Sequence, residues 1–177
     1  LRTLSFTDSL NPGDVVYLMS GVYTSNSRVI NIYFRKGTQS APIVIKAYPG
    51  ENPIVDGNQN HYGVYAEGAS HLHIEGLTVR NSWNKGIGIW DSDNIVVAHN
   101  TIYDTDGSNS NNTSGLAFTA VDGAEVYCNT MYDNHARDLE IQPDGRMPNR
   151  ENSTNIVIFN AGSNGGIINV YNNHLYQ

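Results

Sequence analysis

The chain repeats one pattern of residues, and this internal repeat restricts its possible fold more than any other feature. Residues 85–104 align with residues 114–133 at a constant offset of 29, which places Gly86 on Gly115. Asparagine, tyrosine and aspartate then coincide in the two segments, as do the short apolar stretches between them. Such a fixed period, with apolar stretches separated by turn residues, predicts a solenoid in which each repeat forms one coil.

The repeat continues on both sides of these two segments. A preceding coil starts at Gly63, which is 23 residues before Gly86, and a following coil starts near Asp138, 23 residues after Gly115. The longer spacing between Gly86 and Gly115 is explained by the polar stretch 104–114, which we interpret as a loop. The register of the repeat is therefore independent of this loop.

The composition favours strands over helices. Of the 177 residues, 39% are hydrophobic and only 15% are charged, with 17 Gly and 11 Tyr, which suits strands and turns. Strands are also expected at 15–19, 29–34, 43–48 and 54–55, which gives three strands per coil. The length suits one domain over residues 1–177, with a cap and turn at 1–14 that covers the first coil. The single Cys128 excludes an internal disulfide.

The charge limits the possible partners. A net charge of −7 argues against nucleic acid as a partner. No apolar run approaches the roughly 18 residues that a membrane-spanning helix needs, so no membrane partner is expected. An acidic protein that acts on an acidic polymer would need a local basic patch or a bridging cation.

Two stretches near the start of the chain resemble a known family. They are PGDVVYLMSGVYT at 12–24 and KGTQSAPIVIKAYPGENPIVDG at 36–57. They are similar to the opening of right-handed parallel β-helix proteins of the pectate-lyase-like group, and most similar to polysaccharide lyase families 9 and 6, which include pectate lyases, alginate lyases and chondroitinase B. The resemblance implies an all-β, right-handed parallel β-helix and an extracellular protein that engages an acidic polysaccharide.

Alternation within each coil predicts which side chains face the core. The inward positions on the first strand of successive coils are Ile87, Ile89, Leu116, Phe118, Leu139 and Ile141. Asn100 and Asn129 are expected at the tight bend between the second and third strands, with left-handed backbone and amides that bond from coil to coil. The stretch 156–158 is expected to resume the second strand.

Two long polar stretches, 104–114 and 142–154, are expected to border the same column of first strands and to wall a groove there. On that face, Lys85 and Arg137 would lie two coils, or roughly 10 Å, apart. Cleavage of a uronate polymer by β-elimination needs a base and a positive group that stabilises the carbanion. Lys85 is the candidate base and Arg137 the candidate charge stabiliser; a solvated surface lysine is the alternative for Lys85.

Carboxylates near this face suggest a calcium site. The candidate ligands are Asp104, Asp106, Asp133 and Asp138. Ca²⁺ takes six to eight oxygen ligands and could bridge the protein to a uronate. The alternative is that these residues are acid-rich turns in an acidic protein.

The candidate substrate-binding residues are Trp83, Trp90, His135 and Glu140. Trp83 and Trp90 bracket Lys85, and exposed aromatic rings stack on the apolar faces of sugars, whereas buried ones fill space in the core. His135 precedes Arg137 at the edge of the groove, and Glu140 projects outward from the following strand.

Three functions therefore remain open. The first is a polysaccharide-lyase-like enzyme that cleaves a pectate-type or alginate-type polymer. The second is a non-catalytic carbohydrate-binding module that uses the same groove. The third is a structural β-helix module of a larger surface protein, because the last coil has no evident cap and a further domain or partner would cover it.

Overall fold

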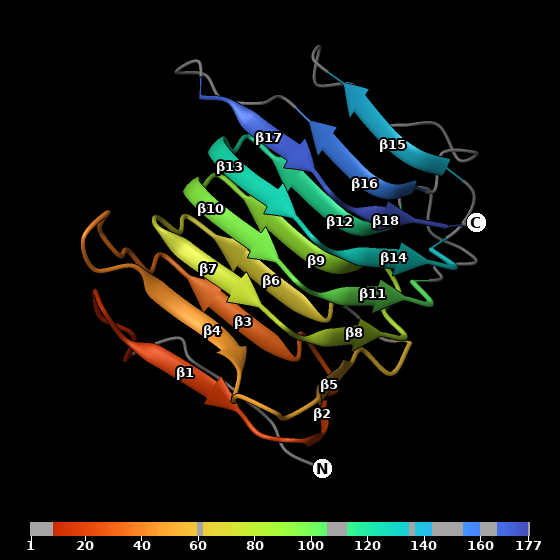
Figure 1. Ribbon diagram of the computed structural model, residues 1–177, viewed down its shortest axis with the longest axis horizontal. Coiled ribbons are helices and arrows are strands. Elements are labelled where there is room, and N and C mark those ends of the chain that lie inside the picture. Colours follow the sequence, from red (N-terminus) through yellow and green to blue (C-terminus); the bar gives the residue numbers. More distant parts are fainter. Residues whose placement is uncertain are drawn as a thin grey trace.

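The computed structural model describes residues 9–59, 62–105, 113–134, 137–142, 154–159 and 166–176, and for Arg137–Gln142 it describes the backbone. Within these ranges it contains eighteen strands and no helix (Figure 1). In chain order they are β1 (Val15–Leu18), β2 (Gly21–Thr24), β3 (Ile30–Tyr33), β4 (Ile43–Ala47), β5 (Pro53–Asp56), β6 (Val64–Glu67), β7 (Leu72–Glu75), β8 (Thr78–Arg80), β9 (Lys85–Trp90), β10 (Asp93–Ala98), β11 (Thr101–Tyr103), β12 (Ser114–Thr119), β13 (Asp122–Tyr127), β14 (Thr130–Tyr132), β15 (Arg137–Gln142), β16 (Thr154–Phe159), β17 (Ile168–Tyr171) and β18 (His174–Leu175).

The strands form three parallel six-stranded sheets, which stack the coils along one axis (Figure 1). Sheet 1 has the order β3-β6-β9-β12-β16-β15, sheet 2 the order β1-β4-β7-β10-β13-β17, and sheet 3 the order β2-β5-β8-β11-β14-β18. No helix in the described residues is long and apolar enough to cross a membrane.

The register predicted from the repeat is confirmed. Lys85 pairs with Ser114 in sheet 1, and Tyr103 pairs with Tyr132 in sheet 3, where their rings stack with centroids 4.8 Å apart. The chain thus forms the expected right-handed parallel β-helix with three strands per coil.

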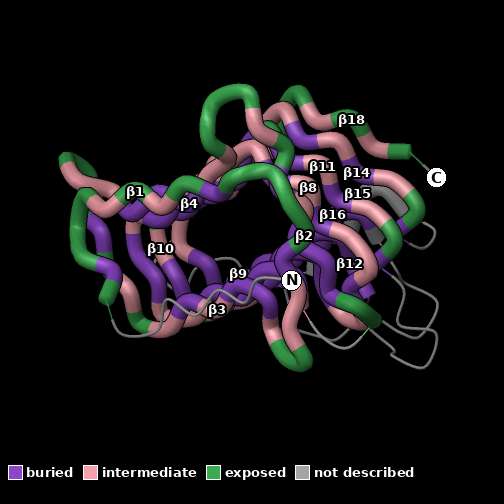
Figure 2. The backbone as a smooth tube through the Cα atoms, turned by 90° about the horizontal axis from the view of Figure 1, so that it is seen from below, coloured by how far each residue is buried: buried purple, intermediate pink, exposed green. Residues whose placement is uncertain are grey.

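The interior is filled by the apolar residues of all three sheets. Alternation places Ile87, Ile89, Leu116 and Phe118 in one continuous core cluster, and each has 0% exposure. In Figure 2 the tube is purple along most of β9, which carries Ile87 and Ile89. Because β-branched residues fit a pleated and buried surface, the short apolar stretches of the sequence become strands.

A ladder of buried asparagines joins the coils at the bend between sheets 2 and 3. Asn100 Nδ2 donates to Asn129 Oδ1 at 3.1 Å, and Asn129 Nδ2 donates to Asn173 Oδ1 at 2.9 Å. The predicted ladder is therefore confirmed. The left-handed backbone, however, lies one residue earlier, at His99 and Cys128 with φ of 57° and 53°, because those side chains leave the bend while the asparagines turn into it.

The prediction that residues 156–158 resume the second strand is wrong. They belong to β16, which lies in sheet 1 beside β12, with Ile156 paired to Leu116 and Ile158 paired to Phe118. First and second strands both consist of apolar residues at alternate positions, so this pattern does not distinguish the two sheets.

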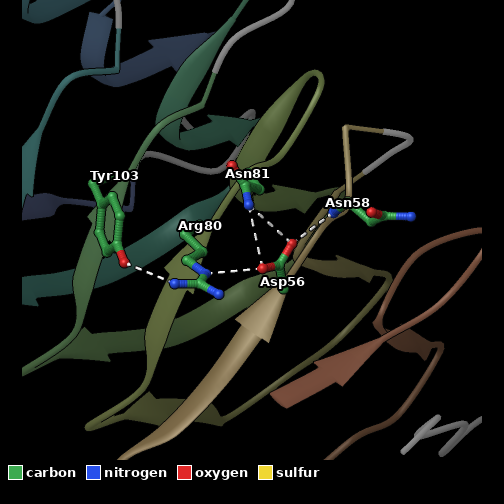
Figure 3. A network of polar contacts seen from close by, with 5 residues as sticks. All are labelled: Asp56, Asn58, Arg80, Asn81 and Tyr103. Atoms are coloured by element: carbon green, nitrogen blue, oxygen red, sulfur yellow. Dashed lines mark hydrogen bonds and ion pairs between the residues drawn. The ribbon is translucent and has the colours of Figure 1, made fainter. Parts of the chain in front are cut away.

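Polar contacts on the outside of sheet 3 converge on one carboxylate (Figure 3). Asp56 is only 8% exposed and accepts a hydrogen bond from Arg80 Nε at 2.8 Å, two from Asn81 Nδ2, and one from the backbone nitrogen of Asn58. Arg80 also donates to the hydroxyl of Tyr103. These contacts join three successive coils.

We expect Asp56→Ala to lower the free energy of unfolding by about 2 kcal/mol, because it leaves the guanidinium, the amide and a backbone N–H without their acceptor. The partial exposure of Arg80 keeps the loss below that of a fully buried ion pair. Chemical denaturation measures the change. Asp56→Asn keeps one acceptor and should lose about half as much; an equal loss in both variants would mean that the charge, and not the hydrogen bonds, is decisive.

Candidate functional site

Lys85 begins β9 and is the central residue of the candidate site. It is 2% exposed, and burial lowers the pKa of its amine from 10.5 to about 7. A substantial fraction of the amine is therefore unprotonated near neutral pH, as a general base requires. The alternative of a solvated surface lysine is wrong.

The neighbouring glycine explains how a lysine comes to lie at this corner. A Cβ on Gly86 would lie 2.5 Å from Ile102 Cγ2 and 2.6 Å from the carbonyl oxygen of Gly115. Only glycine lets the first strand approach sheet 3 and the next coil so closely. The Lys-Gly pair therefore fixes the lysine at the corner where sheet 3 passes into sheet 1.

Arg137 lies farther from Lys85 than the sequence predicted. Thr154 pairs with both Ser114 and Arg137, so β16 lies between β12 and β15. Lys85 and Arg137 are therefore three strands apart, about 14 Å at the spacing of adjacent strands, instead of two. β15 comes before β16 in the chain but lies beyond it in the sheet, and the insertion of β16 separates the two residues.

Both long stretches connect to strands of the same sheet. Residues 104–114 enter β12 and residues 142–154 join β15 to β16, and all three strands belong to sheet 1. The central parts of both stretches, and the N-terminal cap at residues 1–8, lie outside the described residues.

Two of the four predicted calcium ligands can be located in full. Asp104 and Asp133 are exposed, lie one coil apart beyond the ends of β11 and β14, and share a left-handed backbone with φ of 52°. Asp106 and the side chain of Asp138 lie outside the described part of the chain. The described part of the chain contains no group of three or more His, Cys, Asp or Glu side chains that could hold a metal ion. Two carboxylates are too few for Ca²⁺.

Trp90 lies on the outer face of sheet 1 in a cluster of aromatic rings. It stacks on Tyr65 with centroids 4.9 Å apart and meets Tyr62 edge to face at 5.3 Å. A Cβ on Gly88 would lie 2.1 Å from Trp90 Cζ3, so glycine is needed for the indole to lie flat against the strand. Trp83 is half-buried in the turn before β9. Glu140 pairs with Val157 through the backbone, and His135 is outside the described residues.

Sequence reasoning missed an arginine in this cluster. The Arg28 guanidinium carbon lies 3.4 Å from the ring centroid of Tyr65 and 5.6 Å from that of Tyr62. Ile30 pairs with Val64, and Val64 with Ile87; continuing this register places Arg28, Tyr62 and Lys85 in one row across adjacent strands. The offset between the first coils differs from that of the later repeats, so the repeat alone gave no indication of this row.

A hollow of about 870 Å³ lies on the outer face of sheet 2, away from this row. Its lining includes His71, His73, Glu125 and Asn169. Burial lowers the pKa of His73, which favours its neutral form. No lysine or arginine is among the described residues that line the hollow, so it offers an acidic polymer no counter-charge. We therefore place the candidate site on sheet 1.

Three known proteins are similar to this chain. A pectate lyase, PEL9, from Emericella nidulans is 30% identical over 156 residues, covering 66% of this chain and 37% of that protein. The chain thus spans little more than a third of this relative. Two solved structures also align: an alginate lyase from Paenibacillus sp. str. FPU-7, with 13% identity, 99% and 98% coverage of this chain and that one, and a TM-score of 0.39; and pectate lyase Pel9A, with 14% identity, 93% and 70% coverage, and a TM-score of 0.33.

A protein-family model described as the Pel9A-like, right-handed β-helix region matches residues 3–165, almost the whole chain. The matched range includes sheet 1 from β3 to β16 and the row that contains Lys85. The chain therefore belongs to the Pel9A-like right-handed β-helix family.

Proposed function

We propose that this chain is the β-helix of a polysaccharide lyase that cleaves a uronic-acid polymer, of the pectate or alginate type, by β-elimination outside the cell. The observation that carries the proposal is Lys85, whose amine has a pKa of about 7 on the sheet that both long stretches border. The likeness to a protein called pectate lyase supports the choice of substrate class.

In this proposal Lys85 Nζ accepts the proton from the sugar carbon next to the carboxylate. The electron pair left on that carbon forms a double bond as the bond to the glycosidic oxygen breaks, and the leaving oxygen takes up a proton from water. Positive groups beside the carboxylate lower the energy of the intermediate carbanion. Because Lys85 is 2% exposed, the polymer must displace the groups that cover the amine before the proton is transferred.

The distance of Arg137 from Lys85 affects its role. At three strands from the base, we assign Arg137 to a sugar farther along the polymer instead of to the reacting one. Asp104 and Asp133 would contribute to a Ca²⁺ site if the remaining ligands come from elsewhere. We assign no step of the reaction to the cation.

A binding module without catalytic activity is the second candidate. The burial of Lys85 favours it, because a base that stays covered cannot reach a substrate. In that case sheet 1 would bind the polymer through its aromatic rings and Arg28 alone.

One assay distinguishes the two functions. The protein is incubated with polygalacturonate, alginate or chondroitin, with and without Ca²⁺, and the ultraviolet absorbance of the unsaturated product is followed. We expect absorbance to grow with one uronate polymer. Retention of the protein in a polymer-containing gel without any product would instead establish the binding module, and an absence of both would contradict both candidates.

A further inference from the structure

Aromatic rings surround an arginine, Arg28, on the outer face of sheet 1, just before its first strand β3. Arg28 lies over three tyrosine rings, with its guanidinium carbon 3.4 Å from the centroid of Tyr65, 5.3 Å from Tyr33 and 5.6 Å from Tyr62. Trp90 completes the cluster by stacking on Tyr65. We call these five residues the arginine–aromatic platform.

The hydrogen bonds of Arg28 orient its charge without neutralising it. Its Nη1 donates to the Tyr33 hydroxyl and to Asn31 Oδ1. The carboxylate of Glu67 accepts a hydrogen bond from the Tyr65 hydroxyl at 2.5 Å. No ion pair joins Arg28 to a carboxylate among the residues that the structure describes. In a protein of net charge −7, such a cation offers local attraction for an anion.

An exposed phenylalanine extends the platform at a cost in backbone energy. Phe34 is 67% exposed, has a φ of 49°, and stacks on Tyr33 with centroids 6.2 Å apart. A bulky residue in the left-handed region is strained, and an exposed apolar ring gains little from burial. The same left-handed bend follows β6, β9 and β12, at Gly68, Asp91 and Ala120, so the bend itself belongs to the coil. An aromatic ring is not needed to form it, and a ring that contacts a ligand explains why a phenylalanine is found there.

The platform is aligned with the proposed base. Arg28, Tyr62 and Lys85 occupy one row across adjacent strands, so Arg28 and Lys85 are two strands, about 10 Å, apart. A sugar chain that runs across the strands and reaches Lys85 would pass over the platform. Aromatic rings stack on the apolar faces of sugars, and guanidinium forms bidentate bonds with carboxylates.

We propose that the arginine–aromatic platform and the adjacent Phe34 form a subsite for a uronate of the polysaccharide, in which Arg28 binds the carboxylate and the rings of Trp90, Tyr62 and Phe34 contact the sugar. This inference rests on the proposed function for its substrate class. It assigns Arg28 to binding the substrate and not to the chemical step.

The first test measures the affinity of the intact chain for polygalacturonate and for the same polymer with its carboxyl groups reduced to alcohols. We expect Arg28→Ala to weaken binding of polygalacturonate about tenfold, as the loss of one charge-assisted contact predicts, and to change binding of the reduced polymer less than twofold. Lys46→Ala is the matched control. This substitution also removes one positive charge, at a lysine on sheet 2 whose Nζ lies 5.5 Å from the centroid of the Tyr17 ring. The affinity of Lys46→Ala for polygalacturonate should equal that of the wild type.

The second test separates binding from stability. Phe34→Gly relieves the left-handed strain, so its melting temperature should equal or exceed that of the wild type, while its affinity for polygalacturonate should fall about threefold. If both Arg28→Ala and Phe34→Gly bind polygalacturonate as tightly as the wild type, the platform is structural and the subsite is wrong.

Product formation, followed in parallel, distinguishes this inference from the proposed function. Binding that depends on Arg28 without any unsaturated product would refute the lyase and support the subsite. Product formation with unchanged affinity in Arg28→Ala would support the lyase and overturn the subsite. A wild-type chain that binds neither polygalacturonate nor alginate also overturns it.

Discussion

Lys85→Met is expected to raise the free energy of unfolding by as much as about 5 kcal/mol at pH 6 while abolishing product formation. One pKa unit corresponds to about 1.4 kcal/mol, and burial lowers the pKa of Lys85 from 10.5 to about 7. Methionine fills a similar volume without a charge to desolvate. The gain in stability and the loss of activity would then come from the same residue.

The pH dependence of this gain has a definite sign. Between pH 7 and 10.5 the unfolded chain holds a proton on Lys85 that the folded chain has lost, so the stability of the wild type rises with pH in this window. The advantage of Lys85→Met should therefore be largest below pH 7, fall to about 2 kcal/mol at pH 9, and vanish above the unfolded pKa. Urea denaturation of both proteins at pH 6 and pH 9 measures it, and the contributions of other titrating groups cancel in the difference.

Two outcomes would contradict this account. A gain that is constant with pH would mean that the amine is already charged in the folded protein at both pH values. Full production of unsaturated sugar by Lys85→Met would remove Lys85 from the catalytic site, whatever its effect on stability.

Asn129→Ala is expected to destabilise the protein by about 4 kcal/mol. Asn129 has 0% exposure; its Oδ1 accepts from the backbone and side chain of Asn100, and its Nδ2 donates to Asn173 Oδ1 and to the carbonyl oxygens of Val97 and Tyr127. Alanine leaves these groups buried without partners, each at about 1–3 kcal/mol before the structure relaxes. A loss of this size is rare for a single substitution.

Asn169→Ala is the control for this variant. Asn169 is an exposed asparagine whose side chain also makes a hydrogen bond, to Glu125 at 2.7 Å, so its removal should change stability by less than about 0.5 kcal/mol. Guanidinium denaturation compares the two variants. Equal small losses would mean that water replaces the bonds of Asn129, and that the ladder contributes little to the stacking of the coils.

The spacing of residues was sufficient to predict the fold and most of the register between coils. The constant offset between residues 85–104 and 114–133 predicted the pairing of Lys85 with Ser114 and of Asn100 with Asn129, because each coil of a solenoid contacts its neighbours in the same way. The same alternation placed Ile87 and Phe118 in the core.

The folded chain was needed to show which strands become neighbours where the repeat is interrupted. β16 lies between β12 and β15, which widened the separation of Lys85 and Arg137, and the pairing of β3 with β6 brought Arg28 into the row of Lys85. The burial of Lys85 could likewise not be predicted from the sequence. The repeat gives the position of a residue within its coil, but not which groups cover its side chain. Period and alternation describe contacts between equivalent positions, whereas burial and charge depend on residues brought together from different coils.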